Sequence, residues 1–231
     1  MARHGVPCSH VIFAWQVCAL RIAAMLHTHG RKSAGAHVLD RQDQTWVDDD
    51  GHDDGHDGHD HEGGDPHYWL DPIAAIDYVR AICDALIKAD PDRAREYRDN
   101  ADDYVGRLRA LDQEIRMALD PIPQQRRILV TSHHAFGYFG ARYDFKVFPL
   151  AGSEGGAPTP GDIAAVVKEI GITDLPAIFV EAQLSEDALR SIALETAVDV
   201  GTLRSATFDE EAPTYIDMML ENTRIIVEYL T

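Results

Sequence analysis

Two helices are predicted in the middle of the chain by one-sided apolar patterns. The stretch from Ile73 to Ala89 has apolar side chains at the spacing of an amphipathic helix, at Ile76, Val79, Ile82, Cys83 and Leu86. Asp71 and Pro72, directly before it, are residue types favoured at a helix cap and at the first helical position. A helix that begins after Asp71 and buries one face is therefore predicted.

A second and much longer helix is predicted from Pro91 to Leu119. Pro91 breaks the preceding pattern and restarts it, and Pro121 and Pro123 mark the end of the helix. The stretch is highly charged, and its apolar positions are Tyr97, Tyr104, Leu108, Leu111, Ile115 and Met117. A helix of this length predicts a structural spine that crosses much of the molecule.

Short apolar runs alternate with helical patterns beyond residue 120. The predicted strands are 127–132, 145–150, 177–180 and 198–203. The predicted helices are 134–143, 160–170, 185–196 (with Ser185 as its cap and Glu186 and Asp187 in its first turn) and 215–230. This alternation is typical of a parallel α/β sheet. Ligands of such sheets bind beyond the carboxyl ends of the strands.

The first 47 residues give weaker signals. Val11 to Leu26 is apolar but is interrupted by Arg21, which makes it too short and too charged for a membrane span and a poor secretory signal. The stretch is interpreted either as a partial amphipathic helix or as a damaged or mis-started N-terminus. The three cysteines, Cys8, Cys18 and Cys83, have no zinc-type spacing and no disulfide pattern.

The segment 48–65 provides candidate metal ligands instead of a predicted helix or strand. It holds four histidines (His52, His56, His59 and His61), nine carboxylates and five glycines, and no apolar side chain. Imidazole is the commonest protein ligand of zinc, and carboxylates can complete a metal shell. The net charge of −18 favours cations as partners and argues against nucleic acid. The alternative interpretation is an acidic linker in which histidine is incidental.

Four more side chains that could bind a metal lie at the ends of predicted strands or in a predicted turn. The strand ILVTS leads directly into His133 and His134, and the strand AIFV leads into Glu181. His67 comes from the turn-rich sequence DPHYWLDP. Because consecutive residues diverge in direction, only one of His133 and His134 is expected to point into the crevice at the strand ends.

The motifs together resemble one family across residues 48–231. DPHYWLDP, the long charged helix, TSHHAFGYFGARY, IFVEAQLS and TYIDMM occur in the order found in the solute-binding proteins of zinc/manganese ABC transporters (cluster A-I, zinc-uptake type). The resemblance implies two α/β lobes joined by a rigid helix, with His67 and His133 as metal ligands. It implies a supporting or ligating role for Glu181, a non-ligand position for His134, and a zinc-capturing role for the loop histidines.

Two departures from the family pattern stand out. Residues 1–47 are too short for the complete N-terminal lobe that supplies a further histidine, and Ala206 stands where some zinc-binding members have an aspartate ligand. Asp209, with Glu210 and Glu211 beside it, is the nearest substitute in sequence. The expected layout is a truncated N-terminal remnant (1–47), the His/Asp-rich loop (48–65), a bridge and linking helix (66–120) and a C-terminal α/β metal-binding lobe (121–231).

The function expected from the resemblance is metal uptake without catalysis. The chain would bind Zn²⁺, with Mn²⁺ as the alternative, and deliver it to a membrane permease. It would act as a monomer in the periplasm or at the outer face of the membrane. Zinc is favoured because the loop is rich in histidine. The alternatives are a zinc buffer or chaperone that uses the loop alone, a defective reading frame, and a metallohydrolase with Glu181 as base, for which no HExxH pair occurs.

Overall fold

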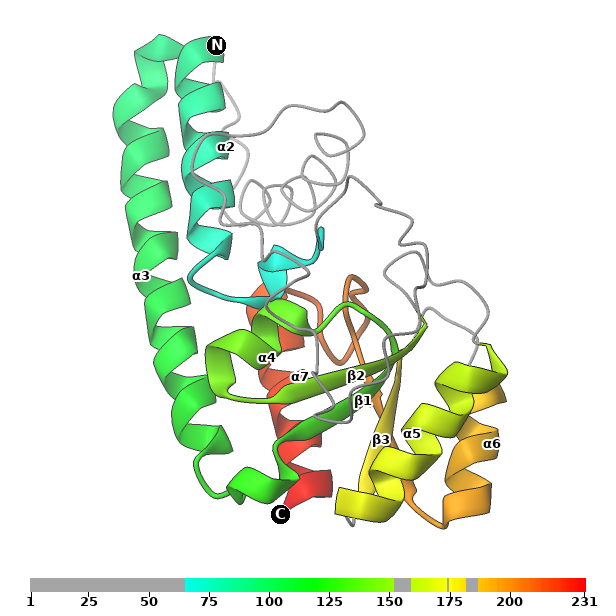
Figure 1. The fold of residues 1–231 in the computed structure, drawn as a ribbon. Helices are drawn as coiled ribbons and strands as arrows, with labels where there is room; N and C mark the ends of the chain where they lie inside the picture. Colours follow the sequence, from blue (N-terminus) through cyan, green and yellow to red (C-terminus); the bar gives the residue numbers. More distant parts are fainter. Residues whose placement is uncertain (1–64, 152–158, 174, 182–186) are drawn as a thin grey trace, which may run out of the picture.

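A parallel four-stranded sheet organises the protein (Figure 1). The computed structural model describes residues 65–151, 159–173, 175–181 and 187–231, so the predictions for residues 1–64 and for the Ser185 cap lie outside the described residues. The strands are β1 (Ile128–His133), β2 (Lys146–Ala151), β3 (Ala177–Glu181) and β4 (Asp199–Leu203), in the order β2-β1-β3-β4. Every pairing is parallel, which confirms the predicted α/β fold.

The two faces of the sheet bury different side chains, because successive strand residues point to opposite sides. Leu129, Phe179 and Leu203 face a core that includes residues of α3, α4 (Gly137–Tyr143) and α7 (Tyr215–Leu230). Val130 and Ile178 belong to a second core, formed with α5 (Pro160–Thr173) and α6 (Asp187–Thr196). The central strands β1 and β3 are buried along their whole length, as expected when helices cover both faces.

The two helices predicted in the middle of the chain form a long antiparallel pair at one side of the sheet (Figure 1). They are α2 (Ala75–Ala89) and α3 (Ala94–Leu119), with the short 3-10 turn η3 (Pro91–Arg93) between them. The 26 residues of α3 make it about 39 Å long, and it also packs against α7. The predicted spine is therefore present as a helix that begins three residues later than Pro91.

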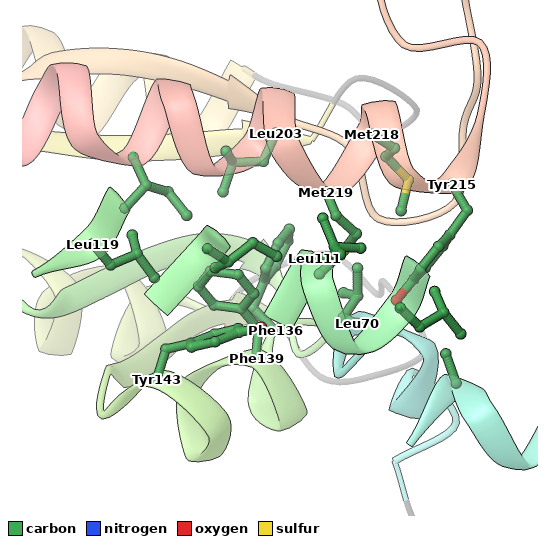
Figure 2. Packing of buried hydrophobic residues seen from close by; sticks show 14 of the residues in the cluster. Leu70, Leu111, Leu119, Phe136, Phe139, Tyr143, Leu203, Tyr215, Met218 and Met219 are labelled. Carbon is green, nitrogen blue, oxygen red and sulfur yellow. The ribbon is translucent and has the colours of Figure 1, made fainter. Parts of the chain in front are cut away.

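The core between α3, α4 and α7 is built from large side chains of all three helices (Figure 2). Leu111 and Leu119 of α3 belong to this cluster together with Met218 and Met219 of α7. Met117 was expected on the apolar side of α3, and this prediction is wrong, since its side chain is 70% exposed. The buried positions follow the helical repeat through Leu108, Leu111, Ile115 and Leu119, and Met117 falls between them.

The residues before α2 form a short bridge that leads into the helix pair. It contains the 3-10 turn η2 (Tyr68–Leu70), and Leu70 is fully buried. Asp71 Oδ1 accepts the backbone N–H of Ile73 at 2.7 Å, but α2 begins only at Ala75 with Ala74 at its cap position, so the prediction of a helix that begins after Asp71 as its cap is wrong. Among the described helices, none is both long and apolar enough to cross a membrane.

Candidate metal centre

The carboxyl ends of β1 and β3 place an imidazole against a carboxylate. The two strands are parallel neighbours, so His133 and Glu181, their last residues, come to the same edge of the sheet. Oε1 of Glu181 lies 2.6 Å from Nδ1 of His133 and also accepts the backbone N–H of His133 at 3.1 Å. The Glu181 N–H in turn donates to the Ser132 hydroxyl at 3.2 Å. Both side chains of the pair are buried.

A second imidazole–carboxylate pair comes from the bridge. Oδ1 of Asp65 lies 2.8 Å from Nδ1 of His67 and accepts the backbone N–H of His67 at 2.9 Å. The pattern repeats that of Glu181 and His133: one carboxylate oxygen contacts both the main-chain nitrogen and the ring nitrogen of a histidine. His67 is buried as well, at 8% exposure.

The two imidazoles face each other across the crevice. The rings of His67 and His133 are nearly perpendicular, at 83°, with centroids 5.1 Å apart. Contact of Nδ1 with a carboxylate oxygen favours the tautomer in which Nδ1 donates and Nε2 keeps its lone pair. Two imidazoles that share one tetrahedral zinc through N–Zn bonds of about 2.0–2.1 Å have ring centroids roughly 5 Å apart. The centroid distance of the pair, 5.1 Å, is therefore compatible with two ligands of one ion.

The bridge is anchored to the C-terminal part of the chain next to this pair. Trp69 packs its ring edge-on against His67, with centroids 5.2 Å apart. The Trp69 Nε1–H donates to the Ser205 carbonyl at 2.7 Å, beyond the end of β4, and the Tyr215 hydroxyl donates to the Trp69 carbonyl at 2.6 Å. These contacts hold His67 against the strand ends although it lies outside the sheet.

His134 lies beside this arrangement and contacts the same aspartate as His67. Its Nδ1 is 3.5 Å from Oδ2 of Asp65, and its side chain is 24% exposed. Burial on its own would raise the pKa of the Asp65 carboxyl, but the interactions with His134 and His67 outweigh it and lower the pKa to about 2. Asp65 is therefore a fully ionised acceptor at neutral pH.

Asp209 is engaged in a separate ion pair. Its Oδ2 accepts from Nε of Arg204 at 2.8 Å, while its Oδ1 accepts the N–H groups of Glu211 and Ala212. The hydrogen bond from Arg204 is the main reason that the pKa of Asp209 is lowered. Glu211 also accepts from Arg204, at 2.8 Å, and Ala206 is exposed.

The predicted site residues thus divide into three groups. The structure brings His67, His133 and Glu181 together, with His134 adjacent through Asp65. The accessory histidines His52, His56, His59 and His61 lie outside the described residues. Within the described part of the chain, no group of three or more His, Cys, Asp and Glu side chains has the geometry to hold a metal ion.

Asp65 is the residue that the sequence reasoning did not single out. It appeared as the last of nine carboxylates in the His/Asp-rich loop and as the first residue of DPHYWLDP, without a role of its own. The usable signal was its position two residues before His67, because an aspartate side chain commonly accepts the N–H two residues further along the chain. That local turn brings its carboxylate to the imidazole.

One protein family matches nearly the whole chain. The family profile described as zinc-uptake complex component A periplasmic (ZnuA) matches residues 21–229. The match begins well before residue 48, where the resemblance of the motifs begins.

The names of the curated relatives mention several different metals. The manganese-binding lipoprotein MntA of Halalkalibacterium halodurans is 36% identical over 177 residues, which cover 74% of this chain and 58% of that protein. The zinc-binding protein TroA of Treponema pallidum is 32% identical over 72% of this chain and 57% of its own length. The iron-binding protein YfeA of Yersinia pestis is 32% identical over 67% of this chain and 51% of its own length. The chain therefore spans little more than half the length of these relatives.

Solved structures show the same fold. The periplasmic zinc-binding protein TroA of Treponema pallidum superimposes with a TM-score of 0.70 at 30% identity, over 74% of this chain and 66% of that one. A cadmium-bound periplasmic metal-binding protein from Candidatus Liberibacter asiaticus has a TM-score of 0.66 at 25% identity, over 73% of this chain and 64% of that one.

Proposed function

Because the chain belongs to the zinc-uptake complex component A periplasmic family, we propose that it is the solute-binding component of a metal-uptake ABC transporter. In this role it binds a divalent metal ion outside the cytoplasmic membrane and delivers the ion to a membrane permease. The ion is cargo, so the site needs affinity and a route for release but no catalytic group. A monomer suffices for this task, because His67 and His133 come from one chain.

The observation that carries the proposal is the pair of facing imidazoles with carboxylates behind them. His67 and His133 each have Nδ1 against a carboxylate oxygen, at 2.8 and 2.6 Å. This arrangement is the usual support of metal-binding histidines, since the carboxylate fixes the ring and raises the basicity of the free nitrogen. Two such pairs meeting at the carboxyl ends of parallel strands have no comparably simple role in folding.

Zinc is the cargo that this donor set favours. Neutral imidazole suits zinc, whereas manganese prefers sites dominated by oxygen. The names of the relatives cover manganese, zinc and iron, so the family alone does not select the metal. The nearest carboxylates, Asp65 and Glu181, are each engaged by a histidine. We therefore propose a zinc site with His67 and His133 as ligands and manganese as the weaker competitor.

The two imidazoles supply half of a tetrahedral shell, since four ligands are usual for zinc. Glu181, whose Oε1 lies 2.6 Å from Nδ1 of His133, is one candidate for a third ligand. Asp209 would first have to leave Arg204, an ion pair with an N–O distance of 2.8 Å, so Glu181 is the stronger candidate. His134 fits a supporting role through Asp65 better than a place in the shell.

The test compares the crevice with the loop in the full chain. One variant carries His67→Ala and His133→Ala, and a second replaces His52, His56, His59 and His61 by alanine. Zinc affinity is measured by competition with a chelator of known affinity. The crevice variant is expected to lose the tightest zinc ion, and the loop variant is expected to keep it. The opposite result would favour a zinc buffer that acts through the loop.

A further inference from the structure

One carboxylate contacts histidines from two separate segments of the site. Asp65 reaches His67 in the bridge with Oδ1 and lies 3.5 Å from His134, after β1, with Oδ2. His134 directly follows His133, so Asp65 connects the segments that carry the two facing imidazoles.

Because Asp65 is buried, leaving one of its carboxylate oxygens without a partner would cost free energy. Its side chain is only 6% exposed, and its Oδ2 is buried and accepts no hydrogen bond from the residues that the structure describes. A buried carboxylate oxygen without a donor is unfavourable unless a positive charge or a polar group lies close by. The Nδ1 of His134, at ion-pair distance, is such a group. The aspartate therefore holds both histidines near it.

His67 needs this support more than His133 does. His133 is the last residue of a fully buried central strand, and its backbone is paired with β2. His67 lies outside the sheet, at the start of the three-residue turn η2. The direction of its ring depends on Asp65 and on the edge contact with Trp69.

We infer that Asp65 is the positioning residue of the metal site. It fixes the tautomer and the ring orientation of His67, and it connects the bridge to the end of β1 through His134. Asp65 does not touch the ion itself. It acts by contacting Nδ1 of His67, which leaves Nε2 as the ring nitrogen available to an ion. The effect on metal affinity rests on the proposed function, whereas the effect on the tautomer of His67 does not require any metal.

The first experiment reads the tautomer in the metal-free protein. In the wild type, ¹⁵N NMR of the imidazole is expected to show His67 with its proton on Nδ1. Asp65→Asn keeps an oxygen that accepts from Nδ1, so the tautomer is expected to persist. Asp65→Ala removes the acceptor, and His67 is expected to shift towards the Nε2-protonated form. An unchanged His67 spectrum in folded Asp65→Ala protein would overturn the inference, whatever the protein binds.

The second experiment measures zinc affinity of the same variants. Loss of a carboxylate that supports a metal-binding histidine typically lowers affinity about 10- to 100-fold, and Asp65→Ala is expected to fall in this range, with Asp65→Asn closer to the wild type. The matched control is Asp99→Asn, which removes one carboxylate from the exposed face of α3, and it should leave affinity unchanged. Equal affinity of Asp65→Ala and Asp99→Asn would contradict the positioning role.

A double-mutant cycle tests whether Asp65 and His134 act together. His134→Ala removes the partner of Oδ2, and it is expected to weaken zinc binding by less than Asp65→Ala. The double variant is expected to be no weaker than Asp65→Ala alone, because both changes break one connection. Fully additive losses would show that His134 acts independently of Asp65. A wild-type protein without zinc affinity would defeat the proposed function but would leave the tautomer result standing.

Discussion

Each facing imidazole has its own carboxylate, and the two carboxylates differ in how firmly they are held. Glu181 is fully buried at the end of β3, and its N–H is fixed by Ser132. Asp65 belongs to the bridge, outside the sheet. The crevice is thus rigid on the side of His133 and more dependent on local contacts on the side of His67. A site with one rigid and one adjustable half is well suited to an ion that must be released.

Glu181→Gln tests the rigid half. The amide oxygen of glutamine still accepts from Nδ1 of His133, but the negative charge is lost, so zinc affinity is expected to fall, by less than the about 10- to 100-fold expected when a whole supporting carboxylate is removed. Chelator competition measures the change. Glu228→Gln is the control, because Glu228 is 56% exposed and pairs with Arg224 on α7. Equal zinc affinity of the two variants would show that Glu181 does not support the site.

The sequence predicted that His133 and Glu181 lie at the carboxyl edge of the sheet, but it did not predict that their strands are neighbours. His133 and Glu181 end neighbouring parallel strands, and such strands present their carboxyl ends at one edge of a sheet. The position of His67 followed only from the resemblance, because nothing in the bridge sequence shows where Trp69 docks. The role of Asp65 was not visible, since one aspartate in a run of nine carboxylates has no distinguishing pattern.

The helices behind the site are joined by a polar cluster within an otherwise apolar interface. Arg142 of α4 makes two hydrogen bonds to the Asp112 carboxylate of α3, at 2.8 and 2.7 Å, and the Tyr143 hydroxyl donates to the same carboxylate at 3.1 Å. Arg142 also lies 3.6 Å from Asp71, in the bridge before α2. This cluster links the helix that follows His133 to the helix pair that follows His67.

Asp112→Asn is expected to destabilise the fold in a pH-dependent way. Burial would raise the pKa of Asp112, but Arg142 and Tyr143 outweigh it and hold the pKa below its ordinary value. A depressed folded-state pKa gives stability that is complete above the unfolded pKa of about 4 and is lost as the pH falls through the folded value. At pH 7 the variant is expected to lose about 2 kcal/mol, the usual range for charged hydrogen bonds.

Urea unfolding of both proteins from pH 7 down to pH 3 measures this difference. The gap between wild type and Asp112→Asn should be constant above about pH 5 and should narrow as the pH falls below about 4. A gap that stays the same at all pH values would mean that the charge of Asp112 is not what stabilises the α3–α4 contact.

Substitution of two glycines by alanine tests the packing of the elements, because one glycine is tightly surrounded and the other is not. A Cβ on Gly201 of β4 would lie 2.8 Å from the ring of Phe179, which is fully buried and cannot move aside. Gly201→Ala is therefore expected to cost about 1–3 kcal/mol. A Cβ on Gly106 of α3 meets nothing within 4 Å, so Gly106→Ala should stabilise by about 0.5–1 kcal/mol. Thermal unfolding compares them, and equal shifts would contradict the close β3–β4 packing.

The elements themselves were largely predictable, and the differences have local causes. The strand patterns were strong because β1 and β3, which are buried along their length, each begin with a run of apolar residues. The helix predicted from His134 begins only at Gly137. The reason is that the His133 carbonyl accepts both the Ala135 N–H and the Thr131 hydroxyl, which makes a turn before the helix. Met117 was misplaced because an apolar residue can lie on the exposed face of a helix at little cost.

At the level of the whole molecule, the order β2-β1-β3-β4 was not predictable from the alternation of strands and helices. Alternation implies parallel strands, but the spatial order depends on which helix crosses which face of the sheet. The order matters here because it makes β1 and β3 direct neighbours. His133 and Glu181, 48 residues apart, are in contact for that reason.

Metal binding at the crevice is expected to stabilise the whole fold. A ligand that binds only the folded state adds about 2.7 kcal/mol when its free concentration is 100 times its Kd. Zinc should therefore raise the Tm of the wild type and of the loop variant. It should not raise the Tm of the His67→Ala/His133→Ala variant. Calorimetry with and without zinc measures the shift, and an increase confined to proteins with an intact loop would place the tight site in the loop.

The local structure around the bound ion is the sharpest check on the proposed site. X-ray absorption at the zinc edge is recorded on the full chain with one equivalent of zinc, after His52, His56, His59 and His61 have been replaced by alanine. The expected spectrum contains two imidazole ligands with Zn–N distances of about 2.0–2.1 Å, and the imidazole signal disappears when His67 and His133 are also replaced. An imidazole signal that survives the replacement of His67 and His133 would contradict a metal site built on these two residues.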